Sequence, residues 1–214
     1  MAKEDRARGK AEGVSTVRGG TYDEFDVNGV CTVLGPLEAG LVSVNGVCTC
    51  ESDVTARHLD CKGVLTIHGN ARAGEMDVEG VVSVGGAKLE ADHIRCEGLL
   101  TVKGEISADV IEADGKISAR EIVGDRIVIK SFWRRGLAKL LFGIGRRFKM
   151  FEFSEVELIE ATTVELQYVK AVSVSGRDVT VGRECEIERV DCCGKLKIDP
   201  TAKVGEISGD YVVV

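Results

Sequence analysis

The sequence of 214 residues predicts an all-β fold, a parallel β-helix in which short strands stack coil upon coil. Three observations predict it. Glycine recurs with a nearly fixed period, apolar and polar residues alternate on both sides of these glycines, and the composition suits a narrow tube. The chain has 26 glycines but only two prolines, so nearly every N–H can join a ladder. Aromatic residues are only 5% of the chain, so few rings need space inside.

The period is set by six glycines whose positions rise in steps of 17, 17, 17, 18 and 17: Gly29, Gly46, Gly63, Gly80, Gly98 and Gly115. Apolar residues stand four and two positions before each glycine, and two and four positions after it; around Gly63 they are Leu59, Cys61, Leu65 and Ile67. A column of small residues follows ten or eleven positions after the glycine: Ala39, Ala56, Ala73, Ala91 and Ala108. Alternation by two predicts strands with one face turned inward.

Each unit of 17–18 residues is therefore expected to form one triangular coil of three short strands. Equivalent strands of successive coils pair in parallel about 4.8 Å apart. We interpret the repeated glycine as a corner residue with positive φ, which glycine adopts easily. Asn28 and Asn45, each directly before such a glycine, fit that turn chemistry. Neither a βαβ sheet nor an immunoglobulin-like sandwich explains identical columns at one period.

The pattern divides the chain into four parts: a disordered, mixed-charge tail (1–20), a first β-helical part (21–130), an insertion (131–152) and a second β-helical part (153–214). After Ile127 and Ile129 the expected glycine is replaced by SFWRRGLAKLLFGIGRRFKMFEF, residues 131–153. Alternation is blurred up to residue 171, and the columns return around Gly194 as Val190, Cys192, Leu196, Ile198, Ala202 and Val204. We expect the insertion to interrupt a turn without disturbing the stack.

The insertion differs from the rest of the chain in charge. No acidic residue occurs between Arg126 and Phe151, and six basic residues lie within 131–151. Without these six, 22 basic residues face 35 acidic ones, so the body carries −13 while the insertion carries +6. Read as a helix, the insertion places its apolar residues on one face. Its glycines weaken that helix by nearly 1 kcal/mol each, and two short pieces hinged at the glycines are equally compatible with the sequence.

Several roles are compatible with such a segment. A membrane span is disfavoured, because about 20 uninterrupted apolar residues are needed and six cations intrude. A basic amphipathic segment with aromatic residues suits the headgroup region of an anionic membrane, and packing on the acidic body or contact with another protein remains open. Nucleic acid is disfavoured by the acidic body. The predicted membrane-binding residues are Trp133, Arg134, Arg135, Leu137, Lys139, Leu140, Leu141, Ile144, Arg146, Arg147, Phe148 and Lys149.

The cysteines and histidines predict no catalytic residue, cofactor or metal site. Six of the eight cysteines fall on inward columns and are expected to be core residues: Cys31, Cys48, Cys50, Cys61, Cys96 and Cys192. No CxxC pair occurs, which disfavours a zinc or redox site. No signal peptide or transmembrane run is found, so the expected compartment is a reducing cytoplasm. His58 and His93 share a column two coils apart, roughly 10 Å, so one metal cannot bind both within a monomer. No phosphate-binding loop or nucleophile elbow is present.

The two ends of the predicted tube raise the question of assembly. A β-helix leaves a row of N–H and C=O groups unpaired at each end unless a cap covers it. The last residues, GDYVVV, resemble a bare apolar strand, and the first coil is expected to begin near residue 22. We predict end-to-end stacking; a lid formed by residues 205–214 or by the insertion is the alternative. The predicted assembly residues are Tyr22, Phe25, Val27, Tyr211, Val212, Val213 and Val214.

These coils, marked by V-x-G and by inward valine, isoleucine, cysteine and alanine columns, resemble the bactofilins, bacterial polymer-forming cytoskeletal proteins. The resemblance covers residues 22–130 well and 172–214 moderately. It implies a right-handed β-helix that forms non-polar, nucleotide-free filaments through contacts between like ends, head to head and tail to tail. It also implies a peripheral location at the inner face of the cell membrane. The insertion and the missing tail depart from the commoner pattern, so we assign membrane contact to the insertion.

The expected function is therefore a non-enzymatic scaffold that supports cell shape, envelope or motility processes. Its expected partners are copies of itself, membrane lipids, and a paralogue or envelope and motility proteins. The alternative is a stacked-coil enzyme, an acyltransferase or a metal-dependent enzyme acting as a trimer. Filaments formed without nucleotide would favour the scaffold, whereas discrete trimers would favour the enzyme.

Overall fold

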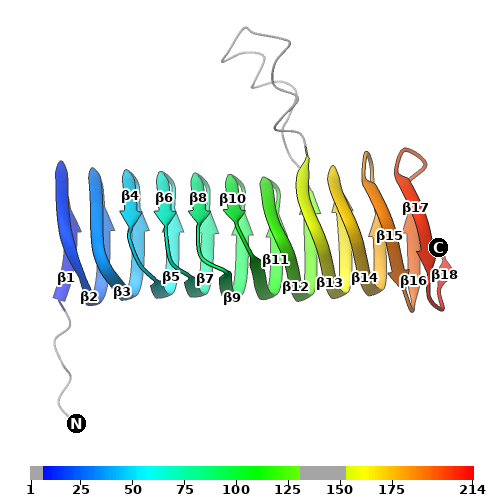
Figure 1. Cartoon of the computed structure of the whole chain (residues 1–214), viewed down its shortest axis with the longest axis horizontal. Coiled ribbons are helices and arrows are strands. Elements are labelled where there is room, and N and C mark those ends of the chain that lie inside the picture. Colours follow the sequence, from blue (N-terminus) through cyan, green and yellow to red (C-terminus); the bar gives the residue numbers. More distant parts are fainter. Residues whose placement is uncertain (1–6, 131–152) are drawn as a thin grey trace, which may run out of the picture.

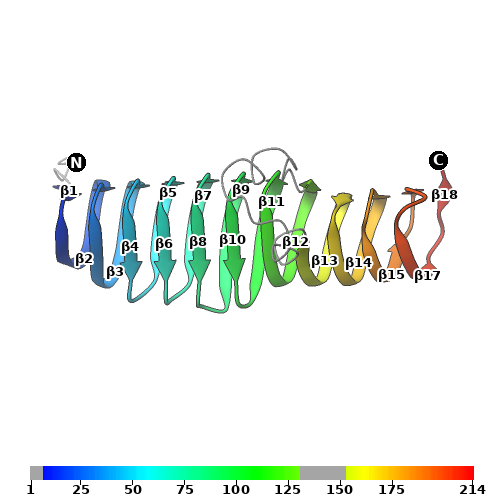
Figure 2. The ribbon, with the colours of Figure 1, turned by 90° about the horizontal axis from the view of Figure 1, so that it is seen from above.

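The computed structural model describes residues 7–130 and 153–214, which form a right-handed parallel β-helix of about 11 turns. The strands succeed one another along the long axis, so the two ends of the chain lie at opposite ends of the tube (Figures 1 and 2). No helix occurs in these two ranges. The fold class predicted from the glycine period and the alternating columns is confirmed.

The described residues contain 18 strands. Their bounds are β1 Ala7–Ala11, β2 Val14–Val27, β3 Val30–Val44, β4 Val47–Cys50, β5 Val54–Cys61, β6 Val64–Ile67, β7 Ala71–Val78, β8 Val81–Val84, β9 Lys88–Cys96, β10 Leu99–Val102, β11 Glu105–Ala113, β12 Lys116–Lys130, β13 Ser154–Gln167, β14 Val169–Val181, β15 Glu186–Cys192, β16 Lys195–Ile198, β17 Lys203–Ser208 and β18 Val212–Val213.

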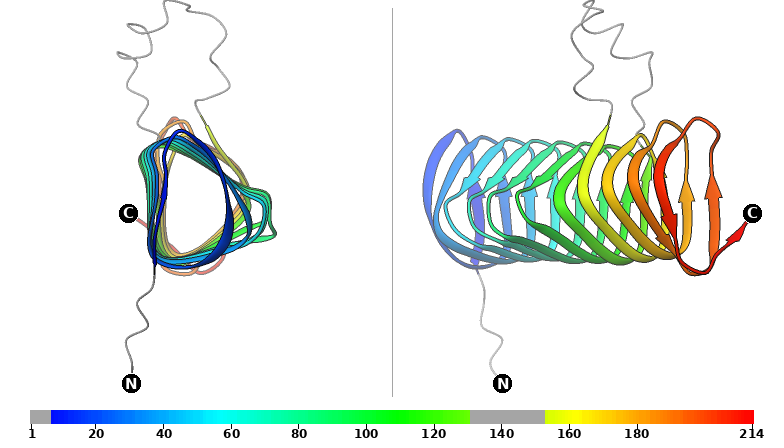
Figure 3. Two further views of the ribbon diagram at one scale, coloured as in Figure 1. Left: turned by 90° about the vertical axis from the view of Figure 1, so that its left-hand side faces the viewer. Right: turned by 45° about the vertical axis from the view of Figure 1, so that its right-hand side comes forward.

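Every pairing between these strands is parallel, and the register follows the predicted period. Val47 of β4 pairs with Val64 of β6, which pairs with Val81 of β8, so one period separates each pair of partners. The coils become slightly shorter on both sides of the insertion, where Glu105 pairs with Glu121 and Ser154 pairs with Val169. Viewed end on, the coils that contain β4 to β10 extend farther out at one corner than the remaining coils do (Figure 3). Residues 51–53, 68–70 and 85–87 form this corner between strands.

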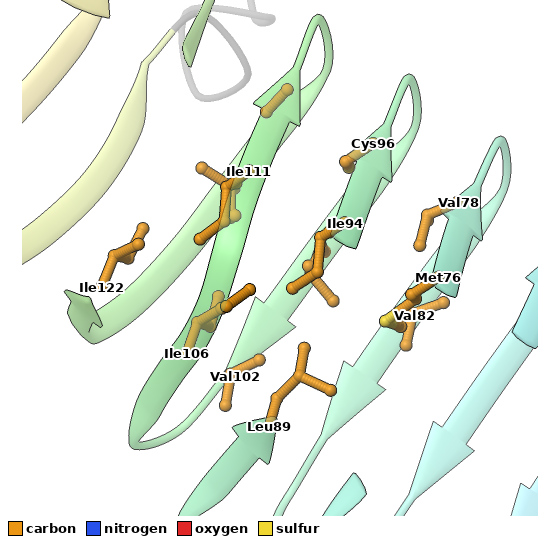
Figure 4. Close-up of a cluster of buried hydrophobic side chains, with 14 of the residues drawn as sticks. Met76, Val78, Val82, Leu89, Ile94, Cys96, Val102, Ile106, Ile111 and Ile122 are labelled. Carbon is orange, nitrogen blue, oxygen red and sulfur yellow. The ribbon is translucent and has the colours of Figure 1, made fainter. Parts of the chain in front are cut away.

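The interior is a continuous stack of the predicted apolar columns. In the close-up, Met76, Ile94 and Ile111 come from successive coils and point into the tube (Figure 4). All three are at most 1% exposed. The same column continues through Ile127 and, beyond the insertion, through Val164 and Leu196. Because each coil contacts mainly its neighbours, burial is cooperative along the stack.

The predicted role of the repeated glycines is wrong in its mechanism. Gly46, Gly63, Gly80, Gly98 and Gly115 are absent from the glycines with positive φ, which are Gly13, Gly20, Gly35 and Gly209. Instead, each corner glycine stacks on the glycine of the preceding coil. A β-carbon at Gly63 would overlap the carbonyl oxygen of Gly46, the same oxygen that accepts a hydrogen bond from the Val64 N–H at 2.8 Å. Glycine is required here by close backbone approach.

The insertion lies at the corner that glycine occupies elsewhere, and the ladder continues across it. Ala113, two positions before Gly115, pairs with Ile129, two positions before the insertion. Across the insertion, Ser118 of β12 pairs with Glu155 of β13. Once the insertion 131–152 is set aside, the coil between these two partners is as long as the next coil, in which Ser154 pairs with Val169. The prediction that the insertion does not disturb the stack is confirmed.

The structure corrects two predictions, one on the N-terminal tail and one on the register around Gly194. Residues 7–20 are not a disordered tail, because β1 and the first half of β2 form the first coil there. Gly194 does not occupy the corner of Gly115, since Leu196 pairs with Val179 and so belongs to the column of Ile111. Its neighbours do point inward as predicted. The shorter coils on either side of the insertion shift the phase of the glycines relative to the corners.

Candidate functional site: the two ends of the β-helix

The N-terminal end of the described β-helix is formed by β1 and by residues 14–18 of β2. β1 pairs only with β2, and residues 14–18 pair only with β3, so one edge of this coil has no partner among residues 7–130 and 153–214. Its inward positions hold small residues, among them Gly9 and Ala11. The outward Val14 is 88% exposed. This coil is the real N-terminal edge of the described tube.

The predicted assembly residues Phe25 and Val27 do not lie at this edge. Gly9 pairs with Phe25 and Ala11 with Val27, so β1 covers both, and both are at most 1% exposed. A β-carbon at Gly9 would overlap the Phe25 ring, which explains a glycine in this strand. These two residues belong to the core, so the structure corrects the prediction that placed them in the end contact.

Tyr22 occupies an intermediate position near this end. It pairs with Ala39 on one side and with Ala7 on the other, and it is half-buried. Its ring centroid lies 5.2 Å from that of Phe25 at an interplanar angle of 56°, and its hydroxyl donates to the Arg18 carbonyl at 3.3 Å. Tyr22 therefore lies directly behind the first coil, on the side of β3.

The C-terminal end consists of β17 and β18, each with one partner within the described ranges. β17 pairs with β15 and β18 pairs with β16. Tyr211 packs against the core, whereas Val212, Val213 and Val214 are 64–73% exposed. The predicted apolar end strand is thus present as the last described element.

Hydrogen bonds fix which groups face outward from this end. The N–H groups of Val212 and Val214 donate to Gly194 and Leu196 of the preceding coil, at 2.8 and 3.1 Å. Because successive N–H groups of a strand point to opposite edges, the Val213 N–H points away from the coil. In β17 the Lys203 N–H donates to the Cys185 carbonyl of the preceding coil at 2.8 Å, so the Val204 N–H also points away from that coil. Such an edge is a template for another strand.

The predicted membrane-binding residues, Trp133 to Lys149, lie outside the described residues. The flanking strands are well anchored. Lys130 at the end of β12 forms an ion pair with Glu165 at 3.0 Å, and the Lys170 ammonium lies 4.8 Å from the centre of the Phe153 ring. Lys130 and Phe153, the described residues on either side of the insertion, are therefore held by contacts with neighbouring coils. None of the described residues forms a helix with the length and hydrophobicity needed to cross a bilayer.

The histidines lie on the outer surface beside carboxylates of adjacent coils. His58 contacts Glu75 at 3.0 Å, and Glu75 in turn pairs with His93, so the two histidines are two coils apart as predicted. His68 contacts Glu51 at 2.9 Å. Within the described ranges, no three histidine, cysteine or acidic side chains are grouped so as to hold a metal ion.

The cysteines are core residues, as the columns predict. Seven of the eight are buried and free, including Cys185, which the repeat did not place because its coil has a different length. Burial raises the pKa of the Cys61 thiol to about 11 and that of Cys96 to about 12. Only Cys193 is exposed.

This distribution gives an expected result for thiol labelling. In the folded protein at about pH 8, one thiol of the eight, Cys193, should react rapidly with a water-soluble aromatic disulfide. Cys61 and Cys96 form thiolate only as the pH approaches their raised pKa values, so they should react only after unfolding in guanidinium. A Cys193→Ser variant is the control and should show no fast phase. A fast phase that persists in this variant would contradict the buried assignment.

Comparisons with known proteins identify no family for this chain. No family model matches it, and no solved structure matches it. The chain is 44% identical over 48 residues to the uncharacterized protein YhbE of Bacillus subtilis (strain 168). This match spans 22% of the present chain and 20% of YhbE, so it covers about a fifth of either protein. The name of that protein states no function.

Proposed function

We propose that this chain is a non-enzymatic, bactofilin-like cytoskeletal scaffold that stacks end to end into filaments without nucleotide. The observation that carries the proposal is the pair of open coil edges, β1 with the start of β2 at one end and β17 with β18 at the other. Unpaired backbone groups at an exposed strand edge favour the addition of another strand. Exposed valines beside both edges add apolar area to such a contact.

The proposed contacts join like ends, head to head and tail to tail. A two-fold axis across such a contact makes facing strands antiparallel, and antiparallel pairs are slightly more stable per residue than parallel ones. Both partners then present the same surface, so each contact is self-complementary. At the C-terminal end the outward N–H groups of Val204 and Val213 would be among the donors to the second copy. Filaments built in this way have no polarity.

The second part of the proposal is attachment to the inner face of the cell membrane through the insertion. Its support is the sorting of charge along the sequence, with +6 within 131–151 and −13 elsewhere. Each cation near an anionic leaflet contributes up to about 1 kcal/mol. The acidic tube is repelled by the same leaflet, which favours contact through the insertion alone. A filament carries many insertions, so its binding exceeds that of one subunit.

Deleting residues 131–151 tests the membrane contact without damaging the tube. The deletion leaves a coil between β12 and β13 that is as long as a later natural coil, the one in which Lys170 pairs with Glu186. We expect the variant to keep its β-sheet circular dichroism and to lose flotation with vesicles containing phosphatidylserine. Neutral vesicles are the control, and the full chain should float poorly with them. Unchanged flotation after the deletion would overturn the membrane contact.

Electron microscopy of the purified full chain without nucleotide tests the filament itself. We expect filaments whose subunits lie along the β-helix axis, and size-exclusion chromatography should show material at the void volume. Discrete trimers at every concentration would instead favour an enzyme of the stacked-coil type. A strictly monomeric chain at high concentration would overturn the proposed function.

A further inference from the structure

One side of the tube carries a flat, uncharged strip of β-branched and hydroxyl side chains. It consists of two outward columns on six successive coils, and we name it the valine–threonine strip. Its residues are Val14, Thr16, Val30, Thr32, Val47, Thr49, Val64, Thr66, Val81, Ser83, Leu99 and Thr101. The five valines of this strip are 37–88% exposed, although large apolar side chains elsewhere on the first six coils are mostly buried.

The strip is ordered by the ladder beneath it. Val30, Val47, Val64, Val81 and Leu99 are consecutive Cα partners, and the hydroxyl column beside them has the same register. The inward residue between the two columns, such as Leu65 on the coil of Val64, is fully buried. The outward side chains therefore repeat about every 4.8 Å along the axis.

Charged residues stand at both margins of the strip and none within it. On one margin Lys62 and Glu79 form an ion pair at 3.3 Å, and on the other Glu51 and His68 are 2.9 Å apart. The strip ends where Lys116 takes the place of the apolar residue on the next coil. An apolar centre with a polar rim is the usual anatomy of a protein interface.

We propose that this strip binds the same strip of a second copy, so that filaments associate side by side. A second copy is the occupant because its strip has the same repeat, and ridges of one ladder then fit between those of the other on every coil. The charge of the body also favours a contact through this strip. Two bodies of −13 each repel, and the uncharged strip is a face on which they can approach without bringing carboxylates together.

The area of the strip decides when this contact can form. Six coils about 4.8 Å apart and columns together about 10 Å wide give roughly 300 Å² per subunit. A stable interface needs about 800 Å² from each partner. A single pair of subunits is therefore too weak, and the contact should appear only where end-to-end stacking places many strips on one filament. The inference thus rests on the proposed function.

The test uses three lysines in the strip and three elsewhere. The strip variant is Val47→Lys, Val64→Lys and Val81→Lys. The matched control is Thr21→Lys, Thr55→Lys and Ser107→Lys, three outward positions that lie on one column of a different face. Both variants add the same charge to the same half of the tube. Slow centrifugation collects bundles and fast centrifugation collects single filaments, with electron microscopy of both fractions.

We expect the full chain and the control to form bundles, and the strip variant to form single filaments with about tenfold less protein in the slow pellet, because like charges would face each other. Raising the salt should increase bundling of the full chain, since it screens the repulsion between bodies. Bundles of the strip variant, or single filaments of the full chain at every salt concentration, would overturn the inference while leaving end-to-end assembly intact. Absence of any filament would instead overturn the proposed function.

Discussion

Replacing Gly63 by alanine is expected to destabilise the β-helix by roughly 3 kcal/mol, a large effect for one methyl group. The added β-carbon would overlap the carbonyl oxygen of Gly46 in the preceding coil. The coils must then separate locally, which weakens the hydrogen bond from the Val64 N–H to that same oxygen. Urea unfolding followed by circular dichroism at one fixed protein concentration measures the change.

Gly85→Ala is the matched control for this substitution. Gly85 is also a corner glycine without positive φ, but a β-carbon there would lie 3.2 Å from the His68 carbonyl oxygen, a distance that small shifts can relieve. We expect a loss of at most about 1 kcal/mol in this variant. Equal stability of the Gly63 variant and the parent would contradict the close stacking of the glycine column.

Placing proline at both Val204 and Val213 is expected to abolish filaments. Both N–H groups point away from the preceding coil, so proline removes two donors from the open edge while the bonds of Lys203, Val212 and Val214 to that coil remain. Because the substitutions lie on the last coil, the rest of the ladder is unchanged. The full chain should pellet on fast centrifugation, and the double variant should stay in the supernatant.

Threonine at the same two positions separates the loss of donors from the loss of side chains. Threonine keeps the N–H groups and the β-branched shape, so this control should still form filaments. Filaments of normal length from the proline variant would show that the C-terminal edge takes no part in assembly. Loss of filaments in the threonine control would place the contact in the valine side chains instead of the backbone.

The sequence predicts the interior of this protein well because a stacked coil repeats one environment. Each inward position meets the same position of the next coil, so a column such as Phe25, Val42 and Leu59 is visible as a period in the amino-acid sequence alone. The insertion is visible for the same reason, as the one place where a coil is greatly lengthened and the ladder still keeps its register.

The features that the sequence did not predict lie where the repeat changes its residues or its length. The first coil escapes the pattern because Gly9, Ala11 and Ser15 occupy three of its inward positions, and these small residues do not produce the alternation in hydropathy that large apolar residues produce. After the insertion, Tyr168 and Glu184 adopt φ of 56° at corners, a conformation usual for glycine, at positions that the glycine period does not mark. The burial of Phe25 depends on that first coil, so the sequence pattern could not predict it.

The continuity of the ladder between β12 and β13 has a consequence for how the chain could be cut. Along these two strands, residues from Ser118 to Lys130 pair with residues from Glu155 to Gln167, and the buried Ser154 hydroxyl accepts the Ile117 N–H at 3.1 Å. The halves are thus joined by a sheet and by shared core columns as well as by a peptide chain. A protease that severed the backbone between residues 131 and 152 would leave two fragments held together without a covalent link.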